Sequence, residues 1–154
     1  MPSVSLKGKA TTTRKLFSRE TVVSISVKAD KHIIWRLLTD AGNYPRWNST
    51  VISISGTIAE GEKIILRAKL APKREFKLRI KEFDIDHFLA WGDGMGTRVY
   101  SLTDSGGEVI FTMTEKIKGP LFPLFAKMIP PFDETFEQFA ADLKREAERL
   151  MQEK

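Results

Sequence analysis

The sequence contains no cysteine, only two histidines and no long apolar run. The lack of cysteine excludes disulfides, thiolate nucleophiles and cysteine-based zinc sites. No stretch of about 18 apolar residues is present, so the sequence predicts no transmembrane segment. The N-terminal residues also lack the apolar core of a secretory signal peptide. We therefore expect a cytoplasmic protein, and nothing in the composition calls for a metal or a cofactor.

Acidic residues are absent from positions 1–19, which hold five basic ones. The whole chain has a formal net charge of +5, so residues 20–154 carry equal numbers of basic and acidic side chains. A folded domain with a basic face for nucleic acid is therefore not predicted. We expect residues 1–19 to be a flexible basic leader, with an organelle transit peptide as the alternative. Residues 20–154 have the length of a single domain.

Alternation of apolar and polar residues predicts strands along most of the chain. The first covers Thr21–Val27, and Asp30 is a plausible N-cap for a helix that ends near Thr39. A short helical turn through Trp47 follows. Further strands are expected at about 51–55, 63–70, 76–81, 88–91, 98–103 and 108–118. After Pro130 and Pro131, apolar spacings of three, four and seven predict a long amphipathic helix over about 132–151.

Successive strands joined by short turns favour one antiparallel sheet, and a single long apolar helix must pack on it. The residue pattern therefore predicts an α+β domain in which a curved sheet wraps the C-terminal helix. Such packing leaves a space between the sheet and the helix.

Several local motifs resemble one family. The stretch "VKADKHIIWRLLTDAGNYPRWN", followed by "AWGDG", "VYSLTDSGGEVIFTMTEKIKG" and "LKREAERL", is similar to the START-like, Bet v 1-like (SRPBCC) superfamily. The similarity is strongest to its polyketide cyclase/dehydrase-like branch and covers about residues 21–151. The resemblance implies a helix-grip fold: a seven-stranded antiparallel sheet, two short helices after the first strand, and a cavity for lipids, polyketides or isoprenoid-like molecules. Some members of the family are cyclases, hydrolases or dehydratases.

Signals for catalysis are few in this sequence. "GDGMG" at residues 92–96 lacks the third glycine of a dinucleotide fingerprint and precedes a strand, which favours a hairpin turn. There is neither a GxSxG elbow nor an HExxH motif. Asp84, Asp86 and His87 are close enough in sequence to suggest a metal site, although a polar turn between strands explains the same residues and is the favoured interpretation. The sequence thus leaves open whether the protein is an enzyme.

Glu115 is the first candidate for an acid–base residue. It shares one face of its strand with Val109, Phe111 and Met113, so it points inward if these residues do. A carboxylate in an apolar cavity would have a raised pKa. The alternative is that Glu115 turns to solvent at a bulge, or that an interior Arg or Tyr pairs with it. Tyr100 is a second candidate, as a cavity hydroxyl.

Five of the ten phenylalanines fall within 18 residues of the C-terminal region, at positions 122, 125, 132, 136 and 139. A gripped helix needs an apolar face, but "PLFPLFAKMIPPF" is apolar beyond one stripe. It favours a rim over the cavity, a dimer contact or a lip that touches a membrane. Trp47 is expected at the cavity's end, either as a structural plug or as part of its wall.

These observations lead to three hypotheses. The first is binding of a hydrophobic small molecule, by a monomer or homodimer that makes at most transient membrane contact. The second is an enzyme on the same scaffold, using Glu115 and Tyr100. The third is a protein-interaction module that uses the Phe-rich rim. The expected ligand-binding residues are Trp47, Leu66, Phe76, Leu78, Ile80, Trp91, Tyr100, Phe111, Met113, Glu115, Phe125, Phe136 and Phe139.

Overall fold

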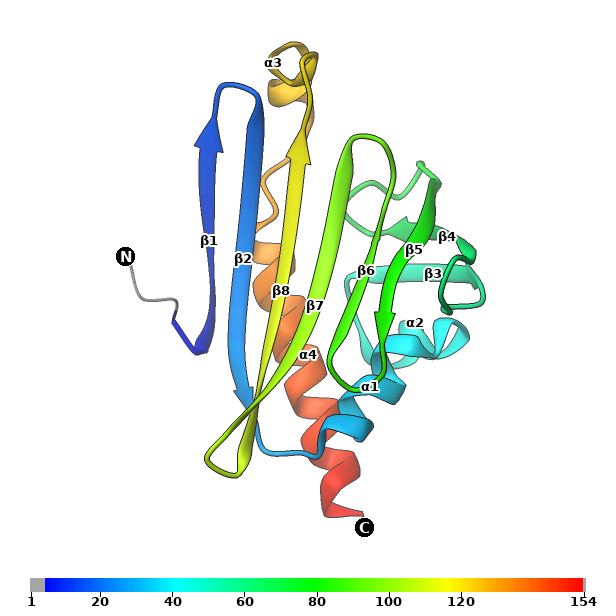
Figure 1. The fold of residues 1–154 in the computed structure, drawn as a ribbon, viewed down its shortest axis with the longest axis vertical. Helices are drawn as coiled ribbons and strands as arrows, with labels where there is room; N and C mark the ends of the chain where they lie inside the picture. Colours follow the sequence, from blue (N-terminus) through cyan, green and yellow to red (C-terminus); the bar gives the residue numbers. More distant parts are fainter. Residues whose placement is uncertain (1–4, 154) are drawn as a thin grey trace.

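The computed structural model describes residues 5–153, which form one antiparallel sheet and a long C-terminal helix (Figure 1). The spatial order of the eight strands is β1-β2-β8-β7-β6-β5-β4-β3. The strands are β1 (Lys7–Lys15), β2 (Ser18–Val27), β3 (Val51–Gly56), β4 (Lys63–Ala68), β5 (Phe76–Asp84), β6 (Phe88–Gly92), β7 (Gly96–Ser105) and β8 (Glu108–Lys118). The helices are α1 (Lys31–Thr39), η1 (Ala41–Asn43), α2 (Tyr44–Trp47), α3 (Phe122–Phe125), η2 (Ala126–Met128) and α4 (Asp133–Gln152).

The helix-grip architecture is confirmed, with one strand more than the seven expected. The additional strand, β1, lies within the segment for which the sequence predicts a flexible leader. It pairs with β2 from Ala10↔Val23 to Lys15↔Ser18, and residues 1–4 of that leader lie outside the described residues. Two side-chain contacts also tie β1 to α4. The Ala10 N–H donates to Glu137 at 3.0 Å, and the Thr12 hydroxyl donates to Asp133 at 2.6 Å.

The long helix α4 packs along β2 and β1 with an apolar face, as its spacing predicts. The buried residues of that face include Phe136, Phe139, Ala140, Leu143 and Ala147. The opposite face carries charged side chains. Helix α1 is buried through a run of apolar residues and meets the C-terminal half of α4 (Figure 1). The core therefore lies between the sheet and α4, with α1 and α2 closing its lower end.

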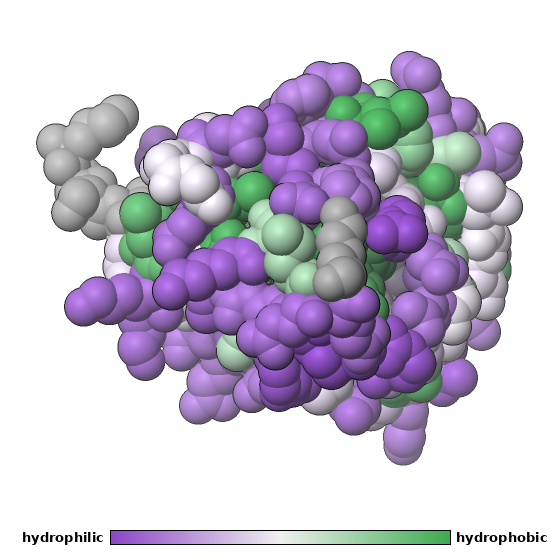
Figure 2. Space-filling view, turned by 90° about the horizontal axis from the view of Figure 1, so that it is seen from below, coloured by the Kyte–Doolittle hydropathy of each residue, from purple (hydrophilic) through white to green (hydrophobic). Residues whose placement is uncertain are grey.

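In the part of the chain from Ser5 to Glu153, none of the helices is long and apolar enough to cross a membrane. The lower end of the molecule, seen in Figure 2, is covered mainly by hydrophilic side chains.

Candidate functional site

A partly enclosed cavity of about 410 Å³ lies between the sheet and the start of α4. Its wall on the sheet side comes from β3 to β8 and from the turns that join β4 to β5 and β6 to β7. Its other side is formed by Met128, Ile129, Pro130, Phe132 and Thr135, which lie at the end of the segment between β8 and α4 and in the first turn of α4. The volume falls within the roughly 300–1,000 Å³ that ligand sites occupy.

Most of the cavity wall is apolar. From the predicted ligand-binding set, Leu66, Phe76, Leu78, Trp91 and Glu115 line it. Their alternation along β4, β5, β6 and β8 brings every second side chain to the concave face of the sheet. The wall also includes residues outside the predicted ligand-binding set, among them Ala68, Leu70, Arg74 and Arg98.

Arg98 and Glu115 form a charged pair within this apolar wall. They lie opposite each other on β7 and β8, and the Nε of Arg98 donates to Oε1 of Glu115 at 2.9 Å. Their side chains are only 15% and 18% exposed. Arg98 also lies over the Phe136 ring, 5.2 Å from its centroid. Burial alone would lower the pKa of Arg98, but Glu115 and Tyr100 outweigh that effect and raise it. Arg98 is therefore charged in the cavity, and its guanidinium lies against the Glu115 carboxyl group.

Glu115 thus points inward and pairs with an interior arginine, rather than turning to solvent at a bulge. The sequence leaves both possibilities open. Tyr100 also points inward, but it lies below the cavity rather than on its wall. Burial raises the pKa of Tyr100 to about 12, although Arg98 acts in the opposite direction. Its hydroxyl has no hydrogen-bond partner among the described residues. Because Tyr100 is neutral at physiological pH and lies outside the cavity lining, Glu115 is the only one of the two acid–base candidates on the wall.

Below the cavity, aromatic side chains fill the space between sheet and helix. The Phe139 ring lies 5.7 Å from Tyr100, 6.2 Å from Phe111 and 5.9 Å from Trp47, measured between centroids. This packed region accounts for most of the predicted ligand-binding residues that do not line the cavity. They are Trp47, Ile80, Tyr100, Phe111, Met113, Phe136 and Phe139.

Trp47 lies in that packed region and not on the cavity wall. Its ring is 4% exposed and packs 5.0 Å from the Tyr44 ring. The Tyr44 hydroxyl donates to the carbonyl of Leu38 at 2.8 Å, which fixes the end of α1. Trp47 therefore occupies the position of a structural plug and not of a wall residue, which is one of the two alternatives that the sequence leaves open.

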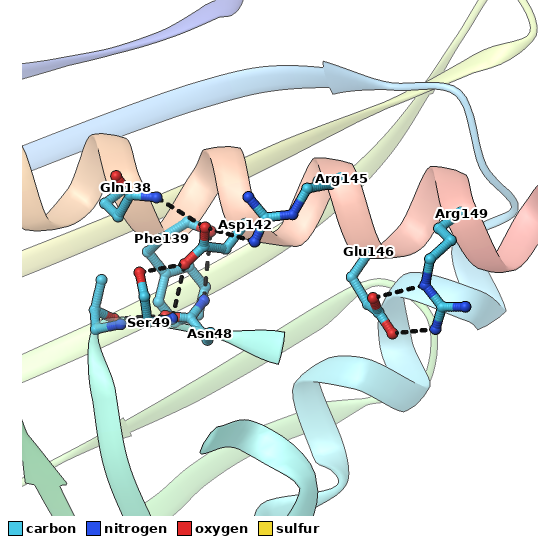
Figure 3. Close-up of polar contacts among 9 residues, drawn as sticks. Asn48, Ser49, Gln138, Phe139, Asp142, Arg145, Glu146 and Arg149 are labelled. Carbon is cyan, nitrogen blue, oxygen red and sulfur yellow. Dashed lines mark hydrogen bonds and ion pairs between the residues drawn. The ribbon is translucent and has the colours of Figure 1, made fainter. Parts of the chain in front are cut away.

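The residues after Trp47 attach this turn to α4 (Figure 3). Asp142 is buried and accepts hydrogen bonds from the backbone N–H and the hydroxyl of Ser49, at 2.8 and 2.6 Å. Gln138 donates to its other oxygen. Burial would raise the pKa of Asp142, but these hydrogen bonds and Arg145 outweigh it, so the pKa is lowered. No pattern in the sequence indicates this contact, because Asp142 lies among ordinary charged residues of an amphipathic helix.

Residues 119–132, which we call the mouth segment, connect β8 to α4 beside the cavity. Arg19 is buried beneath it and donates to the carbonyls of Ile129 and Pro130 at 3.1 and 2.8 Å. The Arg19 guanidinium also lies 4.6 Å from the centre of the Phe132 ring. Phe125, the remaining predicted ligand-binding residue, is not part of the cavity wall and is 36% exposed.

The "GDGMG" stretch forms the turn between β6 and β7 at the edge of the cavity, as the sequence predicts. The Asp93 carboxylate accepts hydrogen bonds from the N–H groups of Met95 and Gly96, both at 2.9 Å. A Cβ at Gly92 would lie 2.2 Å from the Gly96 carbonyl oxygen, so only glycine allows the two strands to approach this closely.

Between Ser5 and Glu153, no three His, Asp or Glu side chains gather in a way that could hold a metal ion. His87 instead lies 3.4 Å from the ammonium group of Lys31 and 2.9 Å from the carbonyl of Ile85. The arrangement as a whole offers a ligand a mostly apolar wall that contains the Arg98–Glu115 pair, with the exposed side chains of Arg74 and Asp93 at its edge and an opening beside the mouth segment.

Comparison with solved structures supports the fold. A conserved protein of unknown function from Enterococcus faecalis aligns with a TM-score of 0.65 at 13% identity, over 91% of this chain and 77% of that one. A START superfamily protein from Mycobacterium smegmatis gives 0.62 at 17%, over 85% and 98%. The Aha1 dimer from Colwellia psychrerythraea gives 0.64 at 16%, over 84% and 96%. At these identities the likeness concerns the fold alone.

No curated protein sequence matches the chain. A family model does match, and it covers β2 through most of α4, which includes every strand and helix that lines the cavity. The resemblance seen in the sequence motifs is thereby confirmed. Because the model described as "Polyketide cyclase / dehydrase and lipid transport" matches residues 18–148, the chain belongs to that family.

Proposed function

We propose that this protein binds a hydrophobic small molecule in the cavity between the sheet and the start of α4, within the cytoplasm. The observation that carries the proposal is the cavity of about 410 Å³, whose wall is apolar except for a few polar groups. Filling such a space with a lipid-like, polyketide-like or isoprenoid-like ligand removes apolar surface from water on both sides, which favours binding by about 25 cal/mol per Å².

The Arg98–Glu115 pair narrows the class of ligand. Each side chain neutralises the other, so an acidic head group on the ligand would meet the Glu115 carboxylate as well as the guanidinium. A neutral hydroxyl or carbonyl group meets no such repulsion, and it can accept from Arg98 or donate to Glu115. We therefore propose a ligand with a long apolar part and a neutral polar group, which the pair orients.

Titration of the purified protein with the fluorescent apolar probe phenylnaphthylamine tests the proposal. Ala68→Phe places a large side chain on the cavity wall, and it should weaken probe binding at least about tenfold. Ala59→Phe makes the same chemical change at a half-buried turn position away from the cavity, and it should leave binding unchanged. A long-chain alcohol should displace the probe better than the fatty acid of equal length. Equal binding by both variants would exclude this cavity as the site.

An enzyme on the same scaffold is the second candidate, because Glu115 lies on the cavity wall as that hypothesis requires. Glu115 accepts a hydrogen bond from Arg98, and an acceptor carboxylate matches the role of a general base. The second group that the hypothesis names, Tyr100, lies outside the wall. Binding without reaction therefore needs fewer assumptions.

A further inference from the structure

Exposed apolar side chains gather at the end of the molecule where β1 meets β2 and where the mouth segment begins; Figure 1 shows these backbone segments at the upper end. The members of this apolar surface are large hydrophobic side chains that are each at least 36% exposed. They are Leu16, Phe17, Leu121, Leu124, Phe125 and Met128, and we call this surface the exposed tip. Leu16, Leu124 and Met128 are 70%, 72% and 76% exposed. Exposed apolar residues gathered in this way mark an interaction surface.

Backbone hydrogen bonds hold the parts of the exposed tip together. The N–H of Gly119 donates to the carbonyl of Phe17 at 3.1 Å, which joins the β1–β2 turn to the mouth segment. The N–H of Lys118 donates to the carbonyl of Met95 at 3.0 Å, which adds the β6–β7 turn. Two turns and the mouth segment, far apart in sequence, therefore form one continuous end.

Basic side chains surround the exposed tip. Arg14 and Lys15 end β1, Lys118 ends β8, and Lys127 lies in η2. All four are exposed, and among the described residues none of them forms an ion pair. No acidic residue occurs in 14–19 or in 116–132, and the β6–β7 turn contributes one, Asp93, whose carboxylate accepts from the N–H groups of Met95 and Gly96. The opposite end of the molecule differs, since Figure 2 shows mainly hydrophilic side chains there.

We propose that the exposed tip docks the protein on membranes that contain anionic lipids. Apolar side chains surrounded by lysine and arginine match the two layers of such a surface: the former enter the acyl boundary, and the latter meet the phosphate and carboxylate groups. Because helix α3 has only four residues, little of the chain can enter the membrane, and the docking contact is shallow. A second copy of the chain is a poorer occupant, because a symmetric dimer would bring two basic rims together.

The position of the exposed tip connects membrane docking with the cavity. Met128 belongs to the exposed tip and also lines the cavity. Docking would therefore place the cavity opening against the lipid surface, where an apolar ligand could pass without crossing water. This last step rests on the proposed function, whereas the docking itself does not.

Vesicle co-sedimentation of the full-length protein tests the docking. Binding is expected to vesicles of phosphatidylcholine mixed with phosphatidylserine, to be weak on phosphatidylcholine alone, and to decrease as salt is raised. Leu121→Ser/Leu124→Ser, which leaves the cavity wall unchanged, should weaken it by about tenfold or more. Lys118→Gln/Lys127→Gln should weaken it roughly fivefold for each charge removed. All four positions are exposed, so these variants should fold, as thermal unfolding would verify.

Matched controls lie at the opposite end of the molecule. Ile85→Ser removes a side chain that is 63% exposed in the β5–β6 turn, and Lys28→Gln/Arg36→Gln removes two exposed charges near α1. Both controls should bind vesicles like the unmodified protein. The added indole of Phe125→Trp should be quenched by brominated lipids. Absence of binding to the anionic vesicles, or equal losses in tip and control variants, would overturn the proposal.

Two further measurements separate the alternatives. If Leu121→Ser/Leu124→Ser abolishes self-association in light scattering and leaves vesicle binding intact, the exposed tip is a dimer contact and the proposal is wrong. The tip variants should also keep their affinity for phenylnaphthylamine. Loss of vesicle binding with intact probe binding supports the docking role, and a failure to bind the probe would concern the proposed function only.

Discussion

At the scale of single residues, the Arg98–Glu115 pair is the charged group most sensitive to substitution. Both side chains are more than four-fifths buried, and each is the other's charged partner at 2.9 Å. Desolvation of two charges costs about as much as their attraction returns, so the intact pair contributes little net stability. Removing one partner leaves a buried charge without compensation.

Glu115→Ala should therefore lower the free energy of unfolding by about 2–4 kcal/mol. The double variant Arg98→Met/Glu115→Met, which replaces the pair with apolar side chains, should recover most of that loss and should bind phenylnaphthylamine at least as well. Urea denaturation of Arg98→Met, Glu115→Met and the double variant measures the coupling. If the double variant is as unstable as the sum of the single ones, the two side chains are not energetically coupled.

At the scale of elements, the sequence predicts most strands and helices because their apolar periodicity is clear, as in Val23, Ile25 and Val27 of β2. Strand β1 has no such signal. Its sequence, KGKATTTRK, is polar on both faces because it lies at the sheet edge. What orders it is pairing with β2 and the contacts of Ala10 and Thr12 with α4. Such tertiary contacts cannot be inferred from local composition.

The cavity wall was predictable only in part for a related reason. Alternation along a strand tells which side chains point inward, and it placed Leu66, Phe76 and Leu78 correctly on the concave face. It does not tell where along the sheet the helix fills the space. Phe139 of α4 fills the lower part against Tyr100 and Phe111, so the open part is confined to the start of α4.

Removal of β1 tests its role as an element. A chain that begins at Phe17 keeps every apolar residue of the buried core, so it should fold. It should lose roughly 2–4 kcal/mol of stability, from the strand pairing and the two contacts with α4. It should also associate, because the edge of β2 becomes free to pair with another chain. Urea denaturation and light scattering measure both effects.

Thr12→Ala, which removes one contact only, should cost about 1 kcal/mol without association. A truncated chain as stable as the full one would show that β1 adds nothing.

At the scale of the whole molecule, polar contacts between α4 and the segment around α2 hold the lower end together, whereas the upper end contains the cavity and the exposed tip. These contacts include charged side chains that link α2 to α4. Glu146 is mostly buried and accepts a hydrogen bond from Arg46 of α2 at 2.5 Å and another from Arg149 at 2.8 Å. The Arg149 hydrogen bond lowers the pKa of Glu146 to about 2, against the effect of burial and with the help of Arg46.

This lowered pKa makes stability depend on pH. The pKa of Glu146 is about 2 in the folded state and 4.5 in the unfolded chain. Its stabilising contribution, on the order of 3 kcal/mol, is thus complete above pH 4.5 and is lost as the pH falls towards 2. Asp142 contributes with the same sign, because its pKa is also lowered.

Urea denaturation between pH 7 and pH 2 should show the decrease in the free energy of unfolding. Glu146→Gln should be less stable at pH 7 and less sensitive to acid, whereas Glu134→Gln, at an exposed position of α4, should follow the unmodified protein. If Glu146→Gln keeps the full acid sensitivity, the link between α2 and α4 does not control the response of the fold to pH.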